Sequence, residues 1–278
     1  MSLNSLSRVA SLQPSVTVTL RDLGLLDHLV ACTKYCLDVC PELRETGCHI
    51  VQDSWSAKAD EILATKPDIV IASVPYRLEA IAEIIRCGVR FLGLAPRSLQ
   101  DIYADIELIA RVMGVPECGS DIAQTMQQEV AAVREQTEPR ERPLVYCEEW
   151  GKPLILSQPW VAELVEAAGG RFFGDPGKQT TDQEVALADP DVIIAAWCGA
   201  GDRVPLEKIV AQRKWEQTKA AQNGCVYCIN DELLNTPAST LIQGLHALAA
   251  AIRADEHQCV HGLRRIAATG SAPGADLR

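Results

Sequence analysis

Cysteine is the residue type with the most evident capacity for chemistry in this chain, which contains 11 of them. Cys32, Cys36, Cys40 and Cys48 form the densest group, and the spacing of four could place the first three on one face of a helix or a strand. Such a group of thiolates would suit a soft metal ion. Pro41 interrupts the segment and favours irregular structure, so we expect no metal site here, with structural zinc as the alternative.

Two shorter motifs could also do chemistry. Cys225 and Cys228 form a C-x-x-C motif, but they lie in a predicted strand, where residues three apart point to opposite faces, whereas a redox pair needs converging thiols. His257 and His261 have the i, i+4 spacing of a helical metal site, without an evident third ligand. The sequence contains no H-E-x-x-H or G-x-S-x-G motif. We therefore predict that the protein is not an enzyme and has no catalytic residues, metal or catalytic cofactor.

Aromatic residues make up 5% of the chain, so their positions are informative. Four of them follow predicted strands, and Trp55 precedes a predicted helix. Ligands of open parallel sheets lie beyond the carboxyl ends of the strands, and large planar ligands need rigid apolar surfaces. The alternative is that each aromatic side chain packs on the core of its own lobe. The predicted ligand-binding aromatic residues are Tyr35, Trp55, Tyr76, Trp150 and Trp197.

Polar groups accompany these aromatic residues. Glu148 and Glu149 follow a predicted strand and could accept hydrogen bonds from a ligand, although solvated surface carboxylates are the alternative. Gly199 and Gly201 follow Trp197 and would let a ligand approach the backbone. A phosphate-binding role has little support, because a Walker lysine and a complete G-x-G-x-x-G are both missing.

Short, nearly continuous apolar runs alternate with amphipathic segments, which is the pattern of parallel α/β units covered on both faces by helices. The predicted strands are 8–12, 29–33, 69–73, 91–94, 144–147, 192–197 and 226–229. The predicted helices are 57–65, 78–87, 99–113, 160–168, 204–219 and 239–252.

One segment interrupts this alternation. Residues 120–136 form an amphipathic stripe through Ile122, Met126, Val130 and Val133, and a proline-containing charged stretch ends it. We expect a single long helix that joins two Rossmann-like α/β lobes; an extra helix of one large sheet domain is the alternative. The predicted division is an N-terminal lobe at 1–115, a bridging helix at 116–140, a C-terminal lobe at 141–254 and a tail at 255–278.

An internal repeat supports two lobes. Residues 61–72 align without a gap on residues 184–195, and each copy holds a glutamate, a short helix, a Pro-Asp turn and a β-branched run. The proline ends the helix, the aspartate satisfies the turn and the apolar run enters the sheet.

Composition excludes several functions. The net charge is −11 and charged residues are 23% of the chain, so a phosphate backbone or an anionic membrane surface would be repelled. Apolar runs are too short for a transmembrane helix, and no signal peptide is visible. We expect no nucleic-acid binding and no membrane insertion. The location is predicted as cytoplasmic if the chain is complete, with reduced cysteines, and periplasmic if a leader has been removed.

The sequence resembles the cobalamin and siderophore class of ABC-transporter substrate-binding proteins from about Arg8 to Arg253. The opening Arg8-Val-Ala-Ser-Leu-Gln-Pro-Ser-Val-Thr, the two Pro-Asp turns and Gly224-Cys-Val-Tyr-Cys-Ile-Asn-Asp carry the resemblance. The loop from Tyr35 to Pro41 is similar to one in the vitamin B12-binding branch. The resemblance implies a class III periplasmic-binding-protein-like fold, with two lobes, a rigid connecting helix and a ligand held in the cleft between the lobes.

The resemblance also implies the ligand and the partner. The ligand would be a corrinoid similar to cobalamin, and a permease dimer of an ABC importer would dock on one glutamate per lobe, Glu61 and Glu184, with Asp60 as the alternative for the first. Glu184 also fits a capping box with Thr181. Cys36 could face the ligand and coordinate its metal. The alternatives are an iron–siderophore or haem-binding protein, a cytoplasmic relative of the importer component, or an enzyme or chaperone of tetrapyrrole metabolism.

Overall fold

The computed structural model describes residues 8–52, 58–73, 78–137, 141–253 and 260–267. The chain forms two compact units. The first comprises Met1–Glu129 with Thr236–Leu241, and the second comprises Val130–Asn235 with Ile242–Arg278. The segment Thr236–Leu241 therefore belongs to the first unit although it lies, in the sequence, between the strands 226–229 and 263–265 of the second, and the sequence pattern does not reveal this.

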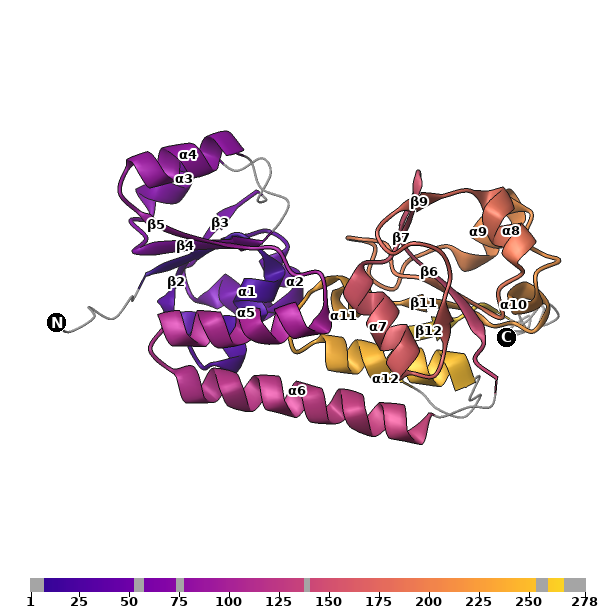
Figure 1. Cartoon of the computed structure of the whole chain (residues 1–278). Coiled ribbons are helices and arrows are strands. Elements are labelled where there is room, and N and C mark those ends of the chain that lie inside the picture. Colours follow the sequence, from indigo (N-terminus) through magenta and orange to yellow (C-terminus); the bar gives the residue numbers. More distant parts are fainter. Residues whose placement is uncertain (1–7, 53–57, 74–77, 138–140, 254–259, 268–278) are drawn as a thin grey trace, which may run out of the picture. The chain divides into compact units, whose positions relative to one another are not determined.

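The first unit is built on a parallel sheet with the strand order β3-β2-β1-β4-β5 (Figure 1). Its strands are β1 (Val9–Ser11), β2 (Leu29–Thr33), β3 (His49–Val51), β4 (Ile69–Ser73) and β5 (Arg90–Leu94). Every residue of the central strands β1 and β4 is buried. Helices cover both faces of these strands, which explains why they are continuously apolar rather than alternating.

Helices lie on both faces of this sheet (Figure 1). They are α1 (Pro14–Asp22), α2 (Cys36–Val39), α3 (Ala59–Ala64), α4 (Leu78–Arg86) and α5 (Leu99–Val112), with short 3-10 helices at Leu26–His28 and Pro41–Glu45. Helix α6 (Pro116–Gln136) packs against α5, where Gly119 lies next to Ala110, and its residues from Val130 onward belong to the second unit. Residues of α1 and α5 share one core cluster, and residues of α3 and α4 share the other. The sequence analysis missed α1, whose buried face carries hydroxyl groups. These groups are satisfied inside the unit; for example, the Thr19 hydroxyl donates to Ser15 O at 2.9 Å.

The dense cysteine group lies inside the core of the first unit. Cys32, Cys36 and Cys40 are all 0% exposed, and the Cys36 sulfur lies 3.2 Å from the Thr33 hydroxyl. The Cys32 thiol is in side-chain contact with those of Cys36 and Cys48. All the cysteines within the described residues are free thiols, and no three metal-ligating side chains there are arranged to hold a metal ion.

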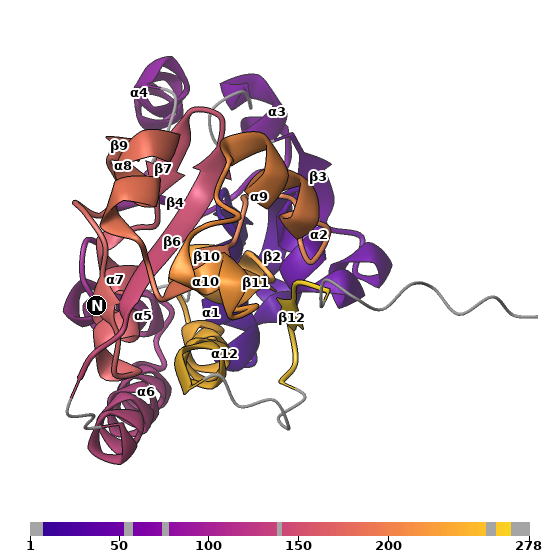
Figure 2. The same cartoon turned by 90° about the vertical axis from the view of Figure 1, so that its right-hand side faces the viewer.

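The second unit is built on a mixed sheet with the order β12-β11-β10-β6-β7-β9, and β8 pairs with β6. Its strands are β6 (Leu144–Gly151), β7 (Leu154–Leu156), β8 (Arg171–Phe172), β9 (Gln179–Thr180), β10 (Val192–Ala195), β11 (Val226–Ile229) and β12 (Leu263–Arg265). The central strands β6, β10 and β11 are parallel neighbours (Figure 2). The sequence predicted these three and missed the short strands around them.

Helices also cover the second sheet. They are α7 (Pro159–Ala167), α8 (Asp182–Ala188), α9 (Leu206–Arg213), α10 (Lys219–Gln222), α11 (Glu232–Asn235) and α12 (Leu241–Arg253). Residues of α8, α9 and α10 share one core cluster with the strands. On the other face, Val165 of α7 and Ile252 of α12 converge with Val145 beside Gly170. None of the helices in the described part of the chain is long and apolar enough to cross a membrane.

The internal repeat forms the same turn in both units. In the first unit, Arg8 N donates to a side-chain oxygen of Asp68 at 3.1 Å and Asp68 N donates back to Arg8 O at 2.8 Å. In the second unit, Leu144 N donates to Asp191 Oδ2 at 2.8 Å and Asp191 N donates to Leu144 O at 2.9 Å. Each aspartate thus joins the start of the strand it precedes to the start of the neighbouring parallel strand.

The residue before each proline has the same conformation in the two copies. Lys66 has φ of 52° and Asp189 has φ of 49°, both in the left-handed region. The right-handed helical region is disfavoured before proline, and a left-handed residue ends the helix and redirects the chain into the strand.

Candidate functional site

The carboxyl ends of β6 and β10 bring two predicted binding residues together in the second unit. The strands are parallel, and Ala195 lies opposite Glu148 in their register. Trp150 is near the end of β6, and Trp197 follows β10 by two residues. Because the two strands end at the same edge of the sheet, both indoles lie at that edge.

These indoles line a cavity of about 600 Å³. Residues of β6, β7, α8, α9 and the loop after β10 surround it: Trp150, Gly151, Lys152, Leu154, Asp182, Trp197, Cys198, Gly199, Ala200, Ile209, Gln212 and Arg213. Trp150 is 43% exposed, and its indole nitrogen donates to Lys152 O at 3.0 Å. The volume is within the range of small-molecule sites, and the mixture of indoles, aliphatic side chains and a few polar groups is typical of them.

Trp197 is held by a buried carboxylate. Its indole nitrogen donates to Glu148 Oε1 at 2.7 Å, and the Tyr146 hydroxyl donates to Glu148 Oε2. Glu148 is 1% exposed. From the sequence, Glu148 was predicted to be a ligand contact, with a solvated surface carboxylate as the alternative. Both readings are wrong, because the alternation of β6 turns this side chain into the unit, where protein donors surround it.

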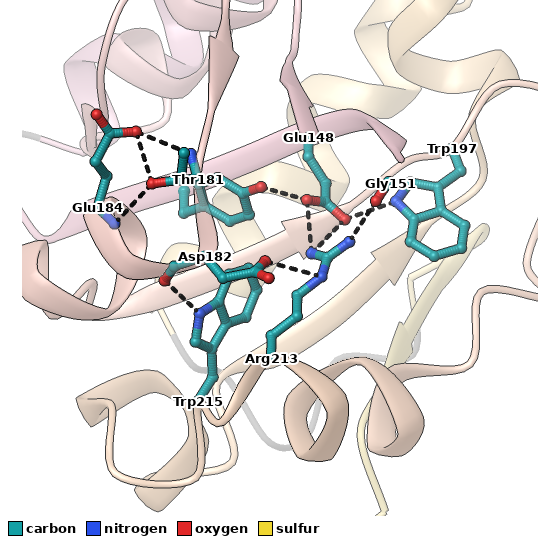
Figure 3. A network of polar contacts seen from close by, with 9 residues as sticks. Glu148, Gly151, Thr181, Asp182, Glu184, Trp197, Arg213 and Trp215 are labelled. Carbon is teal, nitrogen blue, oxygen red and sulfur yellow. Dashed lines mark hydrogen bonds and ion pairs between the residues drawn. The ribbon is translucent and has the colours of Figure 1, made fainter. Parts of the chain in front are cut away.

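Arg213, at the end of α9, neutralises this carboxylate (Figure 3). One terminal nitrogen of its guanidinium donates to both oxygens of Glu148, at 2.9 and 2.8 Å, and the other donates to Gly151 O at 3.1 Å. Its Nε lies 3.5 Å from Asp182 Oδ1. The guanidinium thus uses its planar fork to join α9, β6 and the start of α8.

Aromatic rings enclose the same guanidinium. Its carbon lies 4.8 Å from the ring centroid of Trp215 and 5.9 Å from that of Trp197. Trp215 is 0% exposed, donates to Asp182 O at 3.0 Å and meets Tyr146 edge to face at 5.4 Å. Burial, and then the charge of Glu148, raise the pKa of Tyr146, so its hydroxyl remains a donor.

The glycine-containing loop after Trp197 is held by an aspartate. Gly199 N donates to Asp231 Oδ2 at 2.7 Å and Gly201 N donates to Asp231 Oδ1 at 2.8 Å. Arg203 donates back to Ala200 O and Gly199 O. These amides and this guanidinium already have protein acceptors, which further weakens the case for a phosphate cradle at the loop.

Burial raises the pKa of two ionisable side chains near the ends of β6 and β10. Burial raises the pKa of the Cys198 thiol to about 12, and Asn235 donates to its sulfur at 3.3 Å. Burial also raises the pKa of Glu149, while a 2.7 Å hydrogen bond from Gln158 opposes that shift. Cys198 lines the cavity, a placement that the sequence analysis did not anticipate.

The remaining predicted ligand contacts have different positions. Tyr35 follows β2 in the first unit, is half-buried, and has the Lys34 ammonium 5.0 Å from its ring centroid. Cys36 is fully buried in the core of that unit, so its thiol offers no contact to a ligand and we leave it out of the proposed site. Trp55 and Tyr76 lie outside the described residues.

Arg213 and Asp182 were missed by the sequence analysis. Arg213 is 65 residues from Glu148 along the chain, and a charge in an amphipathic helix has no local signal that distinguishes an internal ion pair from a solvated side chain. The glutamate pair directly after an apolar strand was the available signal, and it indicated the correct edge of the sheet.

Glu184, a predicted docking residue, caps helix α8. Its Oε2 accepts hydrogen bonds from Thr180 Oγ1 at 3.0 Å, Thr181 N at 2.8 Å and Thr181 Oγ1 at 3.0 Å, and Thr181 Oγ1 accepts from Glu184 N. These bonds lower the pKa of Glu184. The capping box predicted from the sequence is therefore present. Glu184 is nevertheless exposed, and within the described residues no contact occupies its Oε1.

The corresponding carboxylates of the first unit are Asp60 and Glu61 in α3. Asp60 is exposed and accepts from Glu61 N at 3.0 Å. Glu61 is partly buried and lies 3.6 Å from His49 Nε2. Both side chains remain accessible on this unit.

A family model for periplasmic binding proteins matches residues 9–233. The chain belongs to the periplasmic binding protein family. A vitamin B12-binding protein of Vibrio cholerae serotype O1 is 26% identical to it over 265 residues, which are 90% of this chain and 91% of that protein.

Solved structures of this family share the two-lobed α/β fold of the chain. The periplasmic vitamin B12-binding protein of Vibrio cholerae superposes with a TM-score of 0.74 at 24% identity, covering 91% of this chain and 99% of that one. A periplasmic haem-binding protein from Roseiflexus superposes with a TM-score of 0.78 at 22% identity, covering 88% of this chain and 97% of that one. A periplasmic haem-binding protein from Pseudomonas aeruginosa superposes with a TM-score of 0.80 at 19% identity, covering 94% of this chain and 98% of that one. The predicted fold class is confirmed.

Proposed function

We propose that this protein binds a corrinoid of the cobalamin type, without catalysing a reaction on it, as the substrate-binding component of an ABC importer. The observation that carries the proposal is the cavity of about 600 Å³ that Trp150 and Trp197 both line, at the ends of β6 and β10. The vitamin B12-binding relative, similar over 90% of this chain, supports the same ligand class.

The indoles suit a flat macrocycle. A tryptophan ring offers a large, stiff apolar surface at a low entropic cost. Trp197 is further restrained, because its nitrogen is bonded to Glu148 and the Arg213 guanidinium lies beside its ring. A pre-organised indole loses little freedom when a ligand covers it, which favours affinity.

The polar groups around the cavity suit a ligand that carries amides rather than carboxylates. Arg213 and Arg203 both donate to acceptors of the protein itself. The side-chain amide of Gln212 and the carboxylate of Asp182, which both line the cavity, offer hydrogen-bonding groups for amides. Corrinoids bear peripheral amides, whereas haem bears two propionates.

Separate titrations with three candidate ligands test this proposal. Cyanocobalamin, haem and a ferric siderophore are titrated separately into the protein, with calorimetry and difference absorbance as readouts. We expect saturable binding with a stoichiometry of one for cyanocobalamin and weaker binding for the other two. Saturable binding of haem with none of cyanocobalamin would replace the corrinoid proposal with haem binding.

A matched pair of variants tests the position of the site. Trp150→Ala removes a 43% exposed indole from the cavity, so it should weaken cyanocobalamin binding by about tenfold or more, as expected for losing an aromatic contact, with little change in stability. Leu187→Ala removes an 88% exposed side chain of the same unit that lies outside this cavity, and it should leave the affinity unchanged. Equal affinities of the two variants would argue against the site.

The proposed docking residues are Glu184 in the second unit and Glu61, or Asp60, in the first. Support comes from Glu184, whose cap uses Oε2 and leaves Oε1 toward solvent, so that the same carboxylate can cap α8 and accept from an arginine of a permease. The lowered pKa of Glu184 keeps it ionised in mildly acidic solution. Tyr35, Trp55 and Tyr76 remain predicted ligand contacts.

A further inference from the structure

The cavity lined by Trp150 and Trp197 has a cationic side chain in its wall, Arg213, and a buried carboxylate behind it neutralises the charge. Arg213 lines the cavity, and its side chain is 9% exposed. Glu148 lies behind it, 1% exposed, and accepts from its guanidinium with both oxygens at 2.8 and 2.9 Å (Figure 3). An arginine side chain remains ionised in proteins, so the net charge at this wall depends on the carboxylate of Glu148.

The other charged groups at the cavity oppose each other. Lys152 and Asp182 both line it, one with a positive and one with a negative side chain. Asp182 Oδ1 is 3.5 Å from Arg213 Nε, and the Asp182 side chain is 46% exposed, which makes its effect on the guanidinium weaker than that of buried Glu148. With Glu148 ionised, the charges of Arg213 and Lys152 are then balanced by those of Asp182 and Glu148. Without the negative charge of Glu148, the cavity would carry an excess positive charge next to two indoles.

A buried guanidinium without its carboxylate is a ready acceptor site for an anion, because it recognises carboxylates through two parallel hydrogen bonds. We propose that Glu148 is a specificity-determining residue, which neutralises Arg213 and thereby keeps the cavity selective for ligands that carry no carboxylate at this wall. This inference rests on the proposed ligand cavity, but it concerns the charge of the ligand and not its identity as cobalamin.

The geometry offers a substitution that removes the charge and can retain the hydrogen bond that anchors Trp197. Glu148 also accepts from the Trp197 indole nitrogen and the Tyr146 hydroxyl. In Glu148→Gln, the amide oxygen can still accept from Trp197 or Arg213, so the indole keeps its anchor while the negative charge is lost. A charge-specific role is thus separable from a positioning role.

The test uses probes of nearly the same shape that differ in charge: cyanocobalamin, and each monocarboxylate obtained by hydrolysing one peripheral amide. The wild-type protein should bind cyanocobalamin more tightly than the monocarboxylates by about tenfold, the scale of one unpaired charge at a partly buried site. In Glu148→Gln, that ratio should fall by about tenfold for at least one monocarboxylate. The double variant Glu148→Gln, Arg213→Gln has a neutral wall again and should recover the wild-type ratio.

An unchanged ratio for every monocarboxylate in Glu148→Gln, with the near-ultraviolet circular dichroism of the wild type, would overturn the inference. If Glu148→Gln fails to fold, Asp182→Asn replaces it, because this partly exposed carboxylate faces the same guanidinium; the ratio should then fall by about two- to threefold, and no change would count against the inference.

Failure of the corrinoid proposal is distinguishable from failure of this inference. If the wild-type protein binds no corrinoid, the same variants are titrated with haem and with haem dimethyl ester, which differ only in the charge of the propionates. A preference of the wild type for the ester that falls in Glu148→Gln would uphold the role of Glu148, and the same ratio in both proteins would refute it.

Discussion

The backbone of Gly151 lies so close to the indole of Trp197 that a Cβ atom at residue 151 would be 2.3 Å from Cζ2 of that ring. Real side chains do not tolerate such a distance, so any other residue at 151 must displace the ring or the strand. The carbonyl of the same glycine accepts from Arg213 at 3.1 Å. Gly151 therefore sets the depth at which the indole sits beside the guanidinium.

Gly151→Ala should displace Trp197 and weaken ligand binding. Overpacking of this kind costs about 1–3 kcal/mol of the free energy of unfolding. We expect a changed near-ultraviolet circular dichroism spectrum, and cyanocobalamin affinity reduced by about tenfold, measured by calorimetry.

Gly201→Ala is the matched control for this substitution. A Cβ atom at Gly201 would meet nothing within 4 Å, but its φ of +58° makes alanine unfavourable by about 1–2 kcal/mol. This variant should lose similar stability and retain the tryptophan spectrum. A Gly151→Ala protein with the wild-type spectrum and affinity would contradict the proposed role of the contact.

Cys198 should report on occupancy of the cavity. Its thiol lines the cavity, and because burial raises its pKa to about 12, little thiolate is present near neutral pH. Cys198 is exposed, as Cys87 and Cys118 are, so a maleimide reagent should label it more slowly than those two because of its raised pKa and not for lack of access. Saturating cyanocobalamin should slow the labelling of Cys198 further, as measured by mass spectrometry of the labelled peptides. Protection of all three thiols to the same extent would indicate a global effect rather than a ligand at the cavity.

Asp105 in α5 should make the stability of the first unit fall as pH rises. Burial, and then the charge of Asp101, raise the pKa of Asp105 from 3.8 to about 6. Between those values the folded chain binds a proton that the unfolded chain has lost, so the free energy of unfolding decreases through this window and the penalty persists above it.

Asp105→Asn should remove this penalty. We expect a gain of about 1 kcal/mol at about pH 7.5, reduced from the full effect of the shift because the group is partly exposed, and no gain below about pH 4. Urea unfolding at both pH values measures it. Glu107→Gln makes the same charge change on the same helix and serves as the control. An equal gain at both pH values would show that the carboxyl titration is not the cause.

The proposed docking carboxylates should matter for the permease and not for the ligand. A Glu61→Ala, Glu184→Ala double variant should retain cyanocobalamin affinity and bind a purified partner permease at least about tenfold more weakly, since each charged hydrogen bond contributes about 1.5–3 kcal/mol. Surface plasmon resonance against immobilised permease measures this loss.

Two further variants sharpen the docking test. Asp60→Ala in place of Glu61→Ala decides between the adjacent carboxylates of α3. Glu216→Ala removes an exposed carboxylate elsewhere in the second unit and should have no effect. Docking of the double variant with wild-type affinity would leave Glu184 with its capping role alone.

Local patterns predicted much of the fold. The strands β2, β4 and β11 have the limits expected from their apolar runs, and the two Pro-Asp turns form as the repeat indicated. These features depend on neighbouring residues: a proline ends a helix, an aspartate satisfies nearby amides and a β-branched run enters a buried strand. Helix α1 escaped prediction because the contacts that satisfy its buried hydroxyls are invisible in a hydropathy pattern.

The sequence by itself determined the α/β class, the repeated turn and the edge of the sheet at which Trp150 and Trp197 meet. The positions and ends of the strands along the chain follow from local periodicity, and a sheet brings the carboxyl ends of parallel strands together. Only the tertiary structure decided that Glu148 is buried with Arg213, 65 residues away, and that Cys36 is in the core. The free energy of a buried charge depends on which group meets it in space, and this pairing leaves no trace in the spacing of either residue.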